Sequence, residues 1–522
     1  MKIMRIVWVV ILTVVLLITG CTQKQNKMPN VLFISIDDLN DWTGALKGHP
    51  QVITPNLDRL CEQGLLFTNA HCSQAVCTAS RNSLLSGIHP SKSGWYGSTS
   101  AMVETYDQVM QDHKMLPQYF KDNGYKTMAV GKVFHKGVSD YEERTGDFWD
   151  TVAPTYKVPM DLKDRGDGYG GTHFYPFPKE GSQIVNHYGK EFRSGHSLCY
   201  GALDREDMPE GKMFDELISE WAVDQLNKDH EKPFFLAVGF VRPHVPYTAP
   251  KEYFDLYNLD EIVIPEVPDD EMTDIPVMGK SIAFGTIKIG DHQAVVNLSD
   301  SYWKELVYGY LACVSFVDDQ AGKVIEALEN SKYADNTIVV LWSDHGQHMG
   351  EKKHWRKQAL WEESTRVPLF FKIPGQKTRG LTSKRVVSLL DIYPTLVDLC
   401  DLPANSKLDG NSLVPLIHNP DLEWEKPVLS SWYYKNHSVR SENWRYIQYR
   451  DGSEELYDHL EDPGEHRNLA SDPEYAEIII EHKKWLPESD ALPAGTSEWK
   501  GDKLDRRIEG WAVADSIPDW LR

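Results

Sequence analysis

Positive charge is scarce in this sequence. The 522 residues include 55 Lys and Arg against 77 Asp and Glu, which gives a formal net charge of −22. Such a chain repels the phosphates of nucleic acids and the head groups of anionic lipids, so broad binding to either is excluded. A local basic pocket inside an acidic protein is still allowed. We therefore expect no nucleic-acid partner.

Cysteine is also scarce, with seven residues in the chain. Seven is an odd number, so the cysteines cannot all pair, and the protein is not a disulfide scaffold. The two that lie closest together, Cys72 and Cys77, lack the further His or Cys partners of a zinc site. At this length the chain has enough residues for one large domain and a smaller one, each with its own core.

A long membrane-spanning run is missing from the N-terminus as well. The apolar run at 6–18 has only thirteen residues, which is too short to cross a bilayer comfortably and is typical of a signal peptide. It ends in Thr-Gly-Cys, which resembles a bacterial lipobox in which Cys21 is acylated. We therefore predict a lipoprotein signal peptide at 1–21, a polar tether at 22–28 and a lipid-anchored protein of the cell envelope. The alternative is a plain signal peptide.

The rest of the chain alternates apolar stretches with amphipathic ones. Four short apolar runs are typical of strands buried on both faces of a sheet, and stretches with helical periodicity lie between them. This alternation predicts an α/β fold with a large, mostly parallel sheet flanked by helices. The expected strands are 30–36, 127–130, 233–240 and 337–342, and the expected helices are 55–63, 116–123, 214–228 and 303–330.

Three regions depart from this alternation. Residues 140–212 and 258–300 have little periodicity and are predicted to form long loops. After residue 420 the pattern changes to short strands, expected at 427–432, 439–444, 445–449 and 455–457, with a closing helix at 475–485. We therefore divide the chain into a catalytic domain at 29–420 and a small antiparallel α+β subdomain at 421–522.

Polar clusters follow each of the four expected strands. Ligands of open α/β sheets bind outside the carboxyl ends of the strands, so these side chains are expected to meet at one site. Each cluster alone has a plain structural explanation, such as a helix cap or a solvated surface, but four coincidences of position argue against it. The clusters contain Asp37 and Asp38, then Lys132 and His135, then His244, then Asp344 and His345.

Three acidic residues and one histidine of these clusters are the expected metal ligands: Asp37, Asp38, Asp344 and His345. Adjacent carboxylates repel each other unless a cation lies between them. Mainly oxygen ligands favour one divalent cation of the Ca²⁺ or Mg²⁺ type, with Ca²⁺ as our expectation, and the single imidazole leaves Mn²⁺ and Zn²⁺ open.

The decisive motif is Cys77-Thr-Ala-Ser-Arg81, followed by a stretch that ends in Ser-Gly. This motif and the order of the other clusters resemble the formylglycine-dependent sulfatases of the alkaline-phosphatase superfamily, over nearly the whole chain after residue 28. Stretches at 74–77, 118–125, 130–135 and 233–239 are similar to the iduronate-2-sulfatase branch. The resemblance implies that Cys77 is oxidised to the aldehyde formylglycine. One hydroxyl of its hydrate then attacks sulfur, and the other expels sulfate.

The same resemblance implies roles for the basic residues around Cys77. The modified Cys77 is expected to complete the metal site. Arg81, one helical turn later, would orient the hydrate. Lys132 and Lys357 would contact the sulfate group and stabilise its charge.

Five further residues have expected roles in proton transfer or substrate binding. By resemblance, His135 takes the proton that drives sulfate release, and His244 is the candidate acid for the leaving oxygen. His354 is expected to line the pocket. His437 and Arg440 are candidates for binding a sugar carboxylate or a second sulfate, and are equally well explained as surface residues.

The expected substrate is a sulfated carbohydrate, such as oligosaccharides of ulvan, another algal glycan or a glycosaminoglycan. The expected protein partner is a sulfatase-maturating enzyme. Ala79 stands where the commonest family signature has Pro, and the radical-based bacterial maturase accepts Ala. Two alternatives are a phosphomonoester or phosphonate ester hydrolase of the same superfamily and a non-catalytic glycan-binding lipoprotein. A single metal site argues against the first, and the presence of Cys77 and Arg81 argues against the second.

Overall fold

The computed structural model describes residues 28–97, 99–135, 141, 143–153, 198–208, 211–286, 289–514 and 517–522. The predicted signal peptide, Cys21, nearly all of the tether and most of the first predicted loop region lie outside these residues. Among the described helices, none is both long and apolar enough to cross a membrane.

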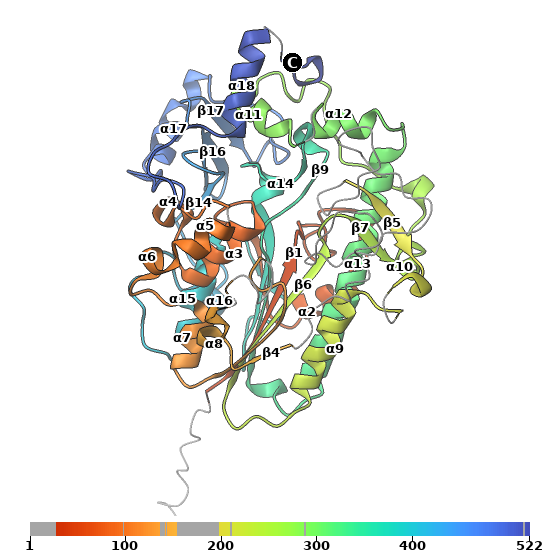
Figure 1. The fold of residues 1–522 in the computed structure, drawn as a ribbon, viewed down its shortest axis with the longest axis vertical. Coiled ribbons are helices and arrows are strands. Elements are labelled where there is room, and N and C mark those ends of the chain that lie inside the picture. Colours follow the sequence, from red (N-terminus) through yellow and green to blue (C-terminus); the bar gives the residue numbers. More distant parts are fainter. Residues whose placement is uncertain are drawn as a thin grey trace, which may run out of the picture.

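A nine-stranded mixed sheet forms the centre of the molecule (Figure 1). Its strands are β1 (Asn30–Asp37), β2 (Leu65–His71), β3 (Lys126–Gly131), β4 (Thr151–Val152), β6 (Phe234–Pro243), β8 (Thr337–Ser343), β11 (Arg366–Lys372), β12 (Leu381–Ser383) and β13 (Val387–Ser388). The spatial order is β12-β2-β11-β8-β1-β6-β3-β4, with β13 beside β2. Strands β8, β1, β6, β3 and β4 are parallel, whereas β11 is antiparallel to both of its neighbours.

Helices cover both faces of this sheet. On one face lie α2 (Pro55–Cys61), α9 (Phe214–Leu226) and α13 (Tyr302–Glu329), and on the other lie α3 (Cys77–Ser86), α7 (Leu116–Asp122), α15 (Ile392–Leu399) and α16 (Val414–His418). The prediction of a mostly parallel sheet flanked by helices is confirmed. The four predicted strands and four predicted helices are present, with ends that differ by at most three residues.

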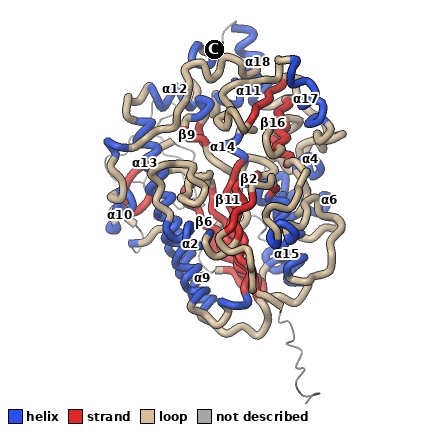
Figure 2. The backbone as a smooth tube through the Cα atoms, turned by 180° about the vertical axis from the view of Figure 1, so that it is seen from behind, coloured by secondary structure: helices blue, strands red, loops and turns tan. Residues whose placement is uncertain are grey.

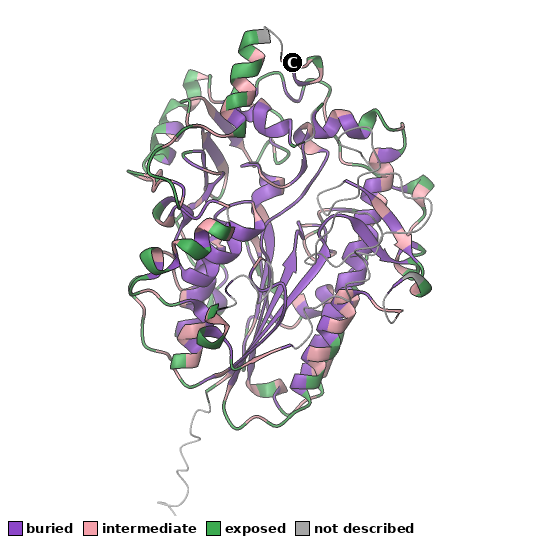
Figure 3. Cartoon of the chain, in the orientation of Figure 1, coloured by how far each residue is buried: buried purple, intermediate pink, exposed green. Residues whose placement is uncertain are grey.

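Strand β1 shows why the sequence of the central strands is almost continuously apolar. Leu32 and Ile34 belong to the core on the α13 face, whereas Val31 and Phe33 belong to the core on the α3 face. Successive side chains of a strand point to opposite faces, so a strand covered on both sides is apolar at neighbouring positions rather than at every second one. Figure 3 shows the central strands buried along their length.

A separate four-stranded antiparallel sheet lies in the C-terminal part, in the order β14 (Val428–Ser431), β15 (His437–Arg440), β16 (Trp444–Gln448), β17 (Glu454–Asp458). The predicted antiparallel subdomain is thereby confirmed, and α17 (Ala476–Lys483) accounts for its predicted closing helix. The boundary between residues 420 and 421 stays a prediction. Figure 2 shows β16 and α17 near one end of the molecule, beyond the central sheet.

Three predictions of local structure were wrong. The loop expected at 140–212 contains regular structure where it is described, since β4 pairs with β3 in the central sheet. The expected strand at 439–444 ends at Arg440, because the polar residues 441–443 form a turn that returns the chain to β16. The expected loop at 258–300 contains two helices, α11 (Val277–Ala283) and α12 (Asp291–Val296). Met278 and Ile282 of α11 lie one turn apart and pack in a third apolar core that includes Trp361, so tertiary packing stabilises a helix that local sequence did not indicate.

Candidate active site

The strands of the central sheet bring the polar clusters together at their carboxyl ends. Asp37 is the last residue of β1 and pairs in register with Pro243 of β6, next to His244. On the other side of β1, Ile36 pairs with Ser343, the last residue of β8. The residues that follow these strands therefore meet at one edge of the sheet, as the order of motifs predicts.

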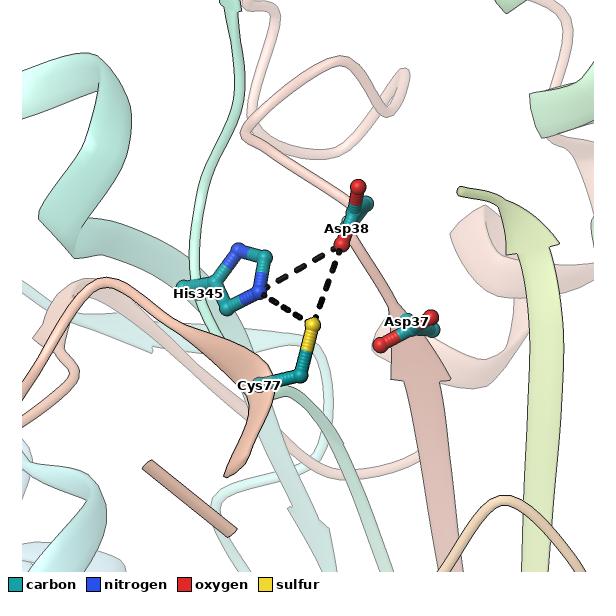
Figure 4. Close-up of side chains that lie close together, drawn as sticks. All are labelled: Asp37, Asp38, Cys77 and His345. Atoms are coloured by element: carbon teal, nitrogen blue, oxygen red, sulfur yellow. Dashed lines mark hydrogen bonds and ion pairs between the residues drawn. The ribbon is translucent and has the colours of Figure 1, made fainter. Parts of the chain in front are cut away.

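Cys77 lies at the centre of this group, at the first position of α3. Its Sγ atom lies 3.2 Å from Nε2 of His345, 3.1 Å from Nζ of Lys357 and 3.8 Å from Oδ1 of Asp38. Figure 4 shows the side chains of Asp38, Cys77 and His345 pointing toward one another, with Asp37 beside them. Helix α3 places the positive end of its dipole at this residue, where negative charge is favoured.

The side chain of Cys77 is deeply buried, with the residue only 2% exposed. Burial, followed by the negative charge of Asp37, raises the pKa of the Cys77 thiol. A thiol with a raised pKa stays protonated at neutral pH and is a weak nucleophile. The unmodified side chain is therefore poorly suited to covalent catalysis.

Arg81 connects the acidic residues of the site. Its Nε donates to Oδ2 of Asp344 at 2.8 Å, and its NH2 group donates to Oδ1 of Asp37 at 3.2 Å. A third donor, NH1, contacts Ser35 Oγ at 3.2 Å and the carbonyl oxygen of Lys132. Arg81 and both carboxylates are fully buried, so the guanidinium fixes their positions as well as balancing their charge.

Two lysines complete the charge balance. Lys132 forms an ion pair with Asp37, and Nζ of Lys357 lies 2.6 Å from Oδ1 of Asp38. Burial alone would raise the pKa of Asp37, but the positive charges of Lys132 and Arg81 lower it well below its usual value. Burial alone would lower the pKa of Lys357, but Asp38 and other nearby anionic groups raise it. Both groups are therefore charged at neutral pH.

The donor set fits a divalent cation. Ligand atoms of Asp37, Asp38, Cys77 and His345 all lie within 4.8 Å of one another. Oδ2 of Asp38 is buried and has no hydrogen-bond partner in the part of the chain that the structure describes. Nδ1 of His345 lies 2.9 Å from the carbonyl oxygen of Gly346, so a proton on Nδ1 leaves the lone pair of Nε2 directed toward the cluster.

Asp344 lies beside this cluster with both oxygens engaged by protein donors. Oδ1 accepts from the backbone N–H groups of Asp38 and His345, each at 3.1 Å, and Oδ2 accepts from Arg81. Burial raises the pKa of Asp344, and Arg81 opposes this. The contact of Asp344 with a metal stays a prediction.

The two histidines with predicted roles in proton transfer differ in how closely the structure ties them to the site. Burial lowers the pKa of His244 well below its usual value, and the positive charges of Lys357 and Lys132 lower it further. Its Nδ1 lies 2.6 Å from the carbonyl oxygen of Val245. His135 is half-buried three residues after Lys132, and its Nδ1 lies 3.4 Å from Oγ1 of Thr99.

The residues predicted to bind substrate beyond the sulfate group have partners within the chain. The ring nitrogens of His354 lie 3.2 Å and 2.9 Å from the carbonyl oxygens of Ala283 and Lys357, so this ring supports the backbone of Lys357. Substrate contact by His354 stays a prediction. His437 and Arg440 are both buried, and each has its own set of polar contacts within the chain.

His437 contacts Ser431 Oγ at 2.9 Å through Nδ1 and Asp490 at 3.1 Å through Nε2. Arg440 donates to Glu362 at 3.1 Å, within a buried network that also contains Arg445 and Glu465. The alternative explanation, that these two residues lie exposed on the surface, is wrong because both are buried. Their contact with a sugar stays a prediction.

Two residues of the site were missed by sequence reasoning. The hydroxyl of Tyr310 donates to the carbonyl oxygen of Asp38 at 2.8 Å and accepts from the N–H of Asn40 at 3.1 Å, which fixes the backbone at the metal cluster. Ser80 donates to the carbonyl oxygen of Asp344 at 2.5 Å. Ser80 lies inside the Cys77–Arg81 motif and could have been found there, whereas Tyr310 reads as an ordinary core residue of α13.

Comparisons with known proteins identify the family of the chain. A sulfatase family model matches residues 29–402, and a model of the C-terminal part of N-sulphoglucosamine sulphohydrolase matches residues 350–491. A sulfatase from Formosa agariphila is 37% identical over 481 residues, covering 90% of this chain and 88% of the relative. Human iduronate 2-sulfatase is 33% identical over 408 residues, covering 74% of this chain and 67% of the relative.

Solved structures show the same fold. A 2-O GAG sulfatase matches with a TM-score of 0.66 at 21% identity, covering 95% of this chain and 96% of that structure. The phosphonate monoester hydrolase of Agrobacterium radiobacter matches with a TM-score of 0.69 at 21% identity, covering 87% of this chain and 94% of that structure.

Proposed function

The chain belongs to the sulfatase family and is a sulfuric ester hydrolase, and from this premise we propose that it removes sulfate from a sulfated carbohydrate, using a formylglycine made from Cys77. The observation that carries this proposal is the position of Cys77 Sγ, which contacts both His345 and Lys357 at the start of α3. The names of similar proteins support a sugar substrate, since they include iduronate 2-sulfatase and an ulvan-active sulfatase. Oligosaccharides of ulvan, another algal glycan or a glycosaminoglycan are the proposed substrates.

Asp37, Asp38 and His345 would hold the cation, with Asp344 and the modified residue 77 completing its ligands. We propose Ca²⁺, because the ligands are mainly carboxylate oxygens. When bound, the cation supplies positive charge that polarises the nucleophile and stabilises the sulfate oxygens. Tyr310 holds the backbone of Asp38 in place for this role.

The basic residues of the site position the nucleophile and the sulfate group. Lys357 reaches the side chain of residue 77 and can neutralise charge that develops on a sulfate oxygen beside it. Lys132 is held at the same site by its ion pair with Asp37. Arg81 holds Asp37 and Asp344 without leaving its buried position, so the charges are arranged before the substrate arrives.

Proton transfer is assigned to the two histidines. His244 is neutral in the free protein because its pKa is lowered. The negative charge of a bound sulfate ester would raise that pKa and allow His244 to protonate the leaving oxygen. His135 is proposed to accept the proton whose loss expels sulfate from residue 77.

Substitution His244→Gln is expected to discriminate between leaving groups. Hydrolysis of a sugar sulfate should fall by about 10²- to 10⁴-fold, because a sugar alkoxide needs a proton to leave. Hydrolysis of 4-nitrophenyl sulfate should fall by less than about tenfold, because 4-nitrophenolate leaves without one. Steady-state kinetics of both substrates measure the difference.

Substitution His135→Gln is the matched control for that experiment. Release of sulfate from residue 77 follows departure of the alcohol. The loss of His135 should therefore slow hydrolysis of both substrates to a common rate. Equal losses for both substrates in His244→Gln would contradict the role of His244 as the acid.

We also propose that the protein is anchored to the cell envelope by acylated Cys21 and that a sulfatase-maturating enzyme modifies Cys77. The apolar run at 6–18 and the Thr-Gly-Cys sequence support the anchor. Ala79 within the Cys77–Arg81 motif supports a maturase of the radical-based type.

The proposal is tested by the mass of the tryptic peptide that carries Cys77, from protein purified from its native host. This peptide runs from Leu60 to Arg81 and also contains Cys61 and Cys72. Conversion of one thiol to an aldehyde lowers its mass by roughly 18 units, and fragment ions must place that loss at residue 77. Unmodified cysteine at this position in active protein would exclude the formylglycine mechanism.

A panel of substrates completes the test. Release of sulfate from sulfated oligosaccharides, without release of phosphate or phosphonate from the corresponding esters, is the expected outcome. Preferential hydrolysis of phosphonate esters would instead favour the alternative that shares the fold of the phosphonate monoester hydrolase.

A further inference from the structure

The first turn of α18 (Lys503–Ala514) reaches the edge of the active site. Nζ of Lys503 donates to Oε1 of Gln358 at 3.3 Å. Gln358 directly follows Lys357, and its N–H donates at 3.0 Å to the carbonyl oxygen of Ala75, two residues before Cys77. The ammonium group of Lys503 therefore contacts the side chain of the residue that follows Lys357, on a segment that a backbone hydrogen bond joins to the segment of Cys77.

Salt bridges and apolar packing fix this turn. Arg450 donates to Asp502 at 2.7 Å and to Asp505 at 2.7 Å and 2.8 Å. Leu504 is 2% exposed and belongs to the apolar core that contains residues of α11, the helix against which α18 packs (Figure 1). The residues on either side of Lys503 are thus held in place, and binding would order little more than its side chain.

Two cations of α18 share a face of the helix. Lys503 and Arg507 are four residues apart, so their side chains are neighbours on the helix surface. Arg507 donates to the carbonyl oxygens of Ser281 and Gly285, and its guanidinium lies 4.6 Å from the centre of the Phe284 ring. Within the described ranges, neither Lys503 nor Arg507 forms an ion pair with a carboxylate.

Counted together with Arg450 and the two carboxylates that it faces, Asp502 and Asp505, the group that contains Lys503 and Arg507 carries one excess positive charge, in a chain with a net charge of −22. Arg356 lies in the same region, and its own charge is balanced by Asp291. The side chain of Lys503 is exposed, but partial desolvation, followed by the positive charges of Arg507 and Arg356, lowers its pKa, and the negative charges of Asp291 and Asp502 oppose this effect. A bound anion would relieve this repulsion.

We propose that Lys503 and Arg507 form a subsite for a second anionic group of the substrate, either a carboxylate or a second sulfate on the same oligosaccharide. This inference rests on the proposed function and narrows the substrate class to sulfated carbohydrates with at least two negative charges. The subsite differs from the predicted role of His437 and Arg440, whose polar atoms bind Asp490 and Glu362.

Binding measurements on the full chain test the subsite without requiring turnover. Three probes are titrated calorimetrically: galactose 6-sulfate, a glucosamine disulfate, and a heparin-derived disaccharide that carries both a carboxylate and a sulfate. The proteins are the wild type, Lys503→Met, Lys503→Arg and Lys500→Met. Lys500 lies three residues away in the same segment, is exposed and pairs only with Glu498 at 2.8 Å among the described residues, so its substitution removes the same charge outside the subsite.

The wild type is expected to bind one or both of the doubly charged probes more tightly than galactose 6-sulfate. For each doubly charged probe that the wild type binds more tightly, Lys503→Met should weaken binding by roughly five- to tenfold relative to Lys500→Met. Lys503→Arg should restore that binding. A loss confined to the heparin disaccharide identifies the carboxylate, and a loss confined to the disulfate identifies the second sulfate. Equal or undetectable binding of all probes, or equal affinities of Lys503→Met and Lys500→Met, would overturn the subsite.

Hydrolysis of 4-nitrophenyl sulfate by the wild type is measured in parallel. It reports on the proposed function alone, because this ester has no second anionic group. Activity together with unchanged binding in Lys503→Met rejects only the subsite. Absence of activity together with a specific loss of binding rejects the proposed chemistry and leaves the subsite in place.

Discussion

Substitution Cys77→Ser is expected to stop steady-state turnover while still allowing one round of sulfate transfer. Serine provides one hydroxyl group in nearly the same position as the thiol, close to Lys357 and His345. Once that hydroxyl is sulfated, no second hydroxyl on the same carbon is present to expel sulfate. The turnover number should therefore fall by on the order of 10⁴-fold or more.

The measurement is a burst experiment with 4-nitrophenyl sulfate. One equivalent of 4-nitrophenol per protein should appear, followed by a flat baseline. Residue 77 should then carry an adduct of about 80 mass units, the mass that a sulfate ester adds to a hydroxyl. The starting protein must show serine at residue 77 by mass, so that no modified form contributes.

Cys72→Ser is the matched control. Cys72 is fully buried five residues before Cys77, and its Sγ donates to the carbonyl oxygen of Ser364 at 3.8 Å, a contact that a serine hydroxyl can also make. The same chemical change outside the site should leave turnover close to that of the wild type. Continued turnover by Cys77→Ser at the wild-type rate would refute the need for two hydroxyl groups on residue 77.

The parts of the fold that could be predicted are those whose sequence signal is local. A strand covered by helices on both faces is apolar at most positions, so β1 and β8 are visible in the sequence as short, nearly continuous apolar runs. The convergence of Asp37, Lys132 and Asp344 follows from one rule about parallel strands, because each of these residues lies at the carboxyl end of a predicted strand.

Strand β11 shows why other parts could not be predicted. Pro368 interrupts its apolar run, and proline cannot donate a hydrogen bond within a sheet, so the sequence argues against a strand. The structure accommodates Pro368 with a shift in the pairing of β11 and β2 between Val367 and Leu369. A proline that ends a strand and a proline that sits in a bulge have the same local sequence signal.

The limits of the site prediction have a similar cause. His437 and Lys503 are both single basic residues far from Cys77 in sequence, and only tertiary structure separates them. His437 is held by Ser431 and Asp490, whereas Lys503 reaches Gln358 beside Lys357. Local sequence identifies the residues that follow a strand but not the residues that a distant helix brings to the same edge.

Substitution Arg81→Met is expected to lower the free energy of unfolding by about 3–5 kcal/mol, because it leaves buried carboxylates without their main charged partner. Asp344 is fully buried and its carboxylate would retain only backbone N–H donors, whereas Asp37 would keep its ion pair with Lys132. Urea unfolding at pH 7, followed by tryptophan fluorescence, measures the loss.

Arg59→Met provides the comparison. Arg59 pairs with Glu329 at 2.7 Å, but the two side chains are 39% and 25% exposed, so solvent screens the pair. Its removal should lower the free energy of unfolding by less than about 1 kcal/mol. Equal losses in Arg59→Met and Arg81→Met would mean that the buried network contributes no more to stability than a surface pair.

Two further variants separate the loss of charge from the loss of geometry. Arg81→Lys keeps the charge, but one ammonium group cannot reach Asp37, Asp344 and the carbonyl oxygen of Lys132 together, so most of the loss should persist. Adding Asp344→Asn to Arg81→Met removes the carboxylate that was left unpaired and should recover part of the stability. Activity should not return with it, because the same contacts that stabilise the fold also hold the acidic residues around Cys77 in position.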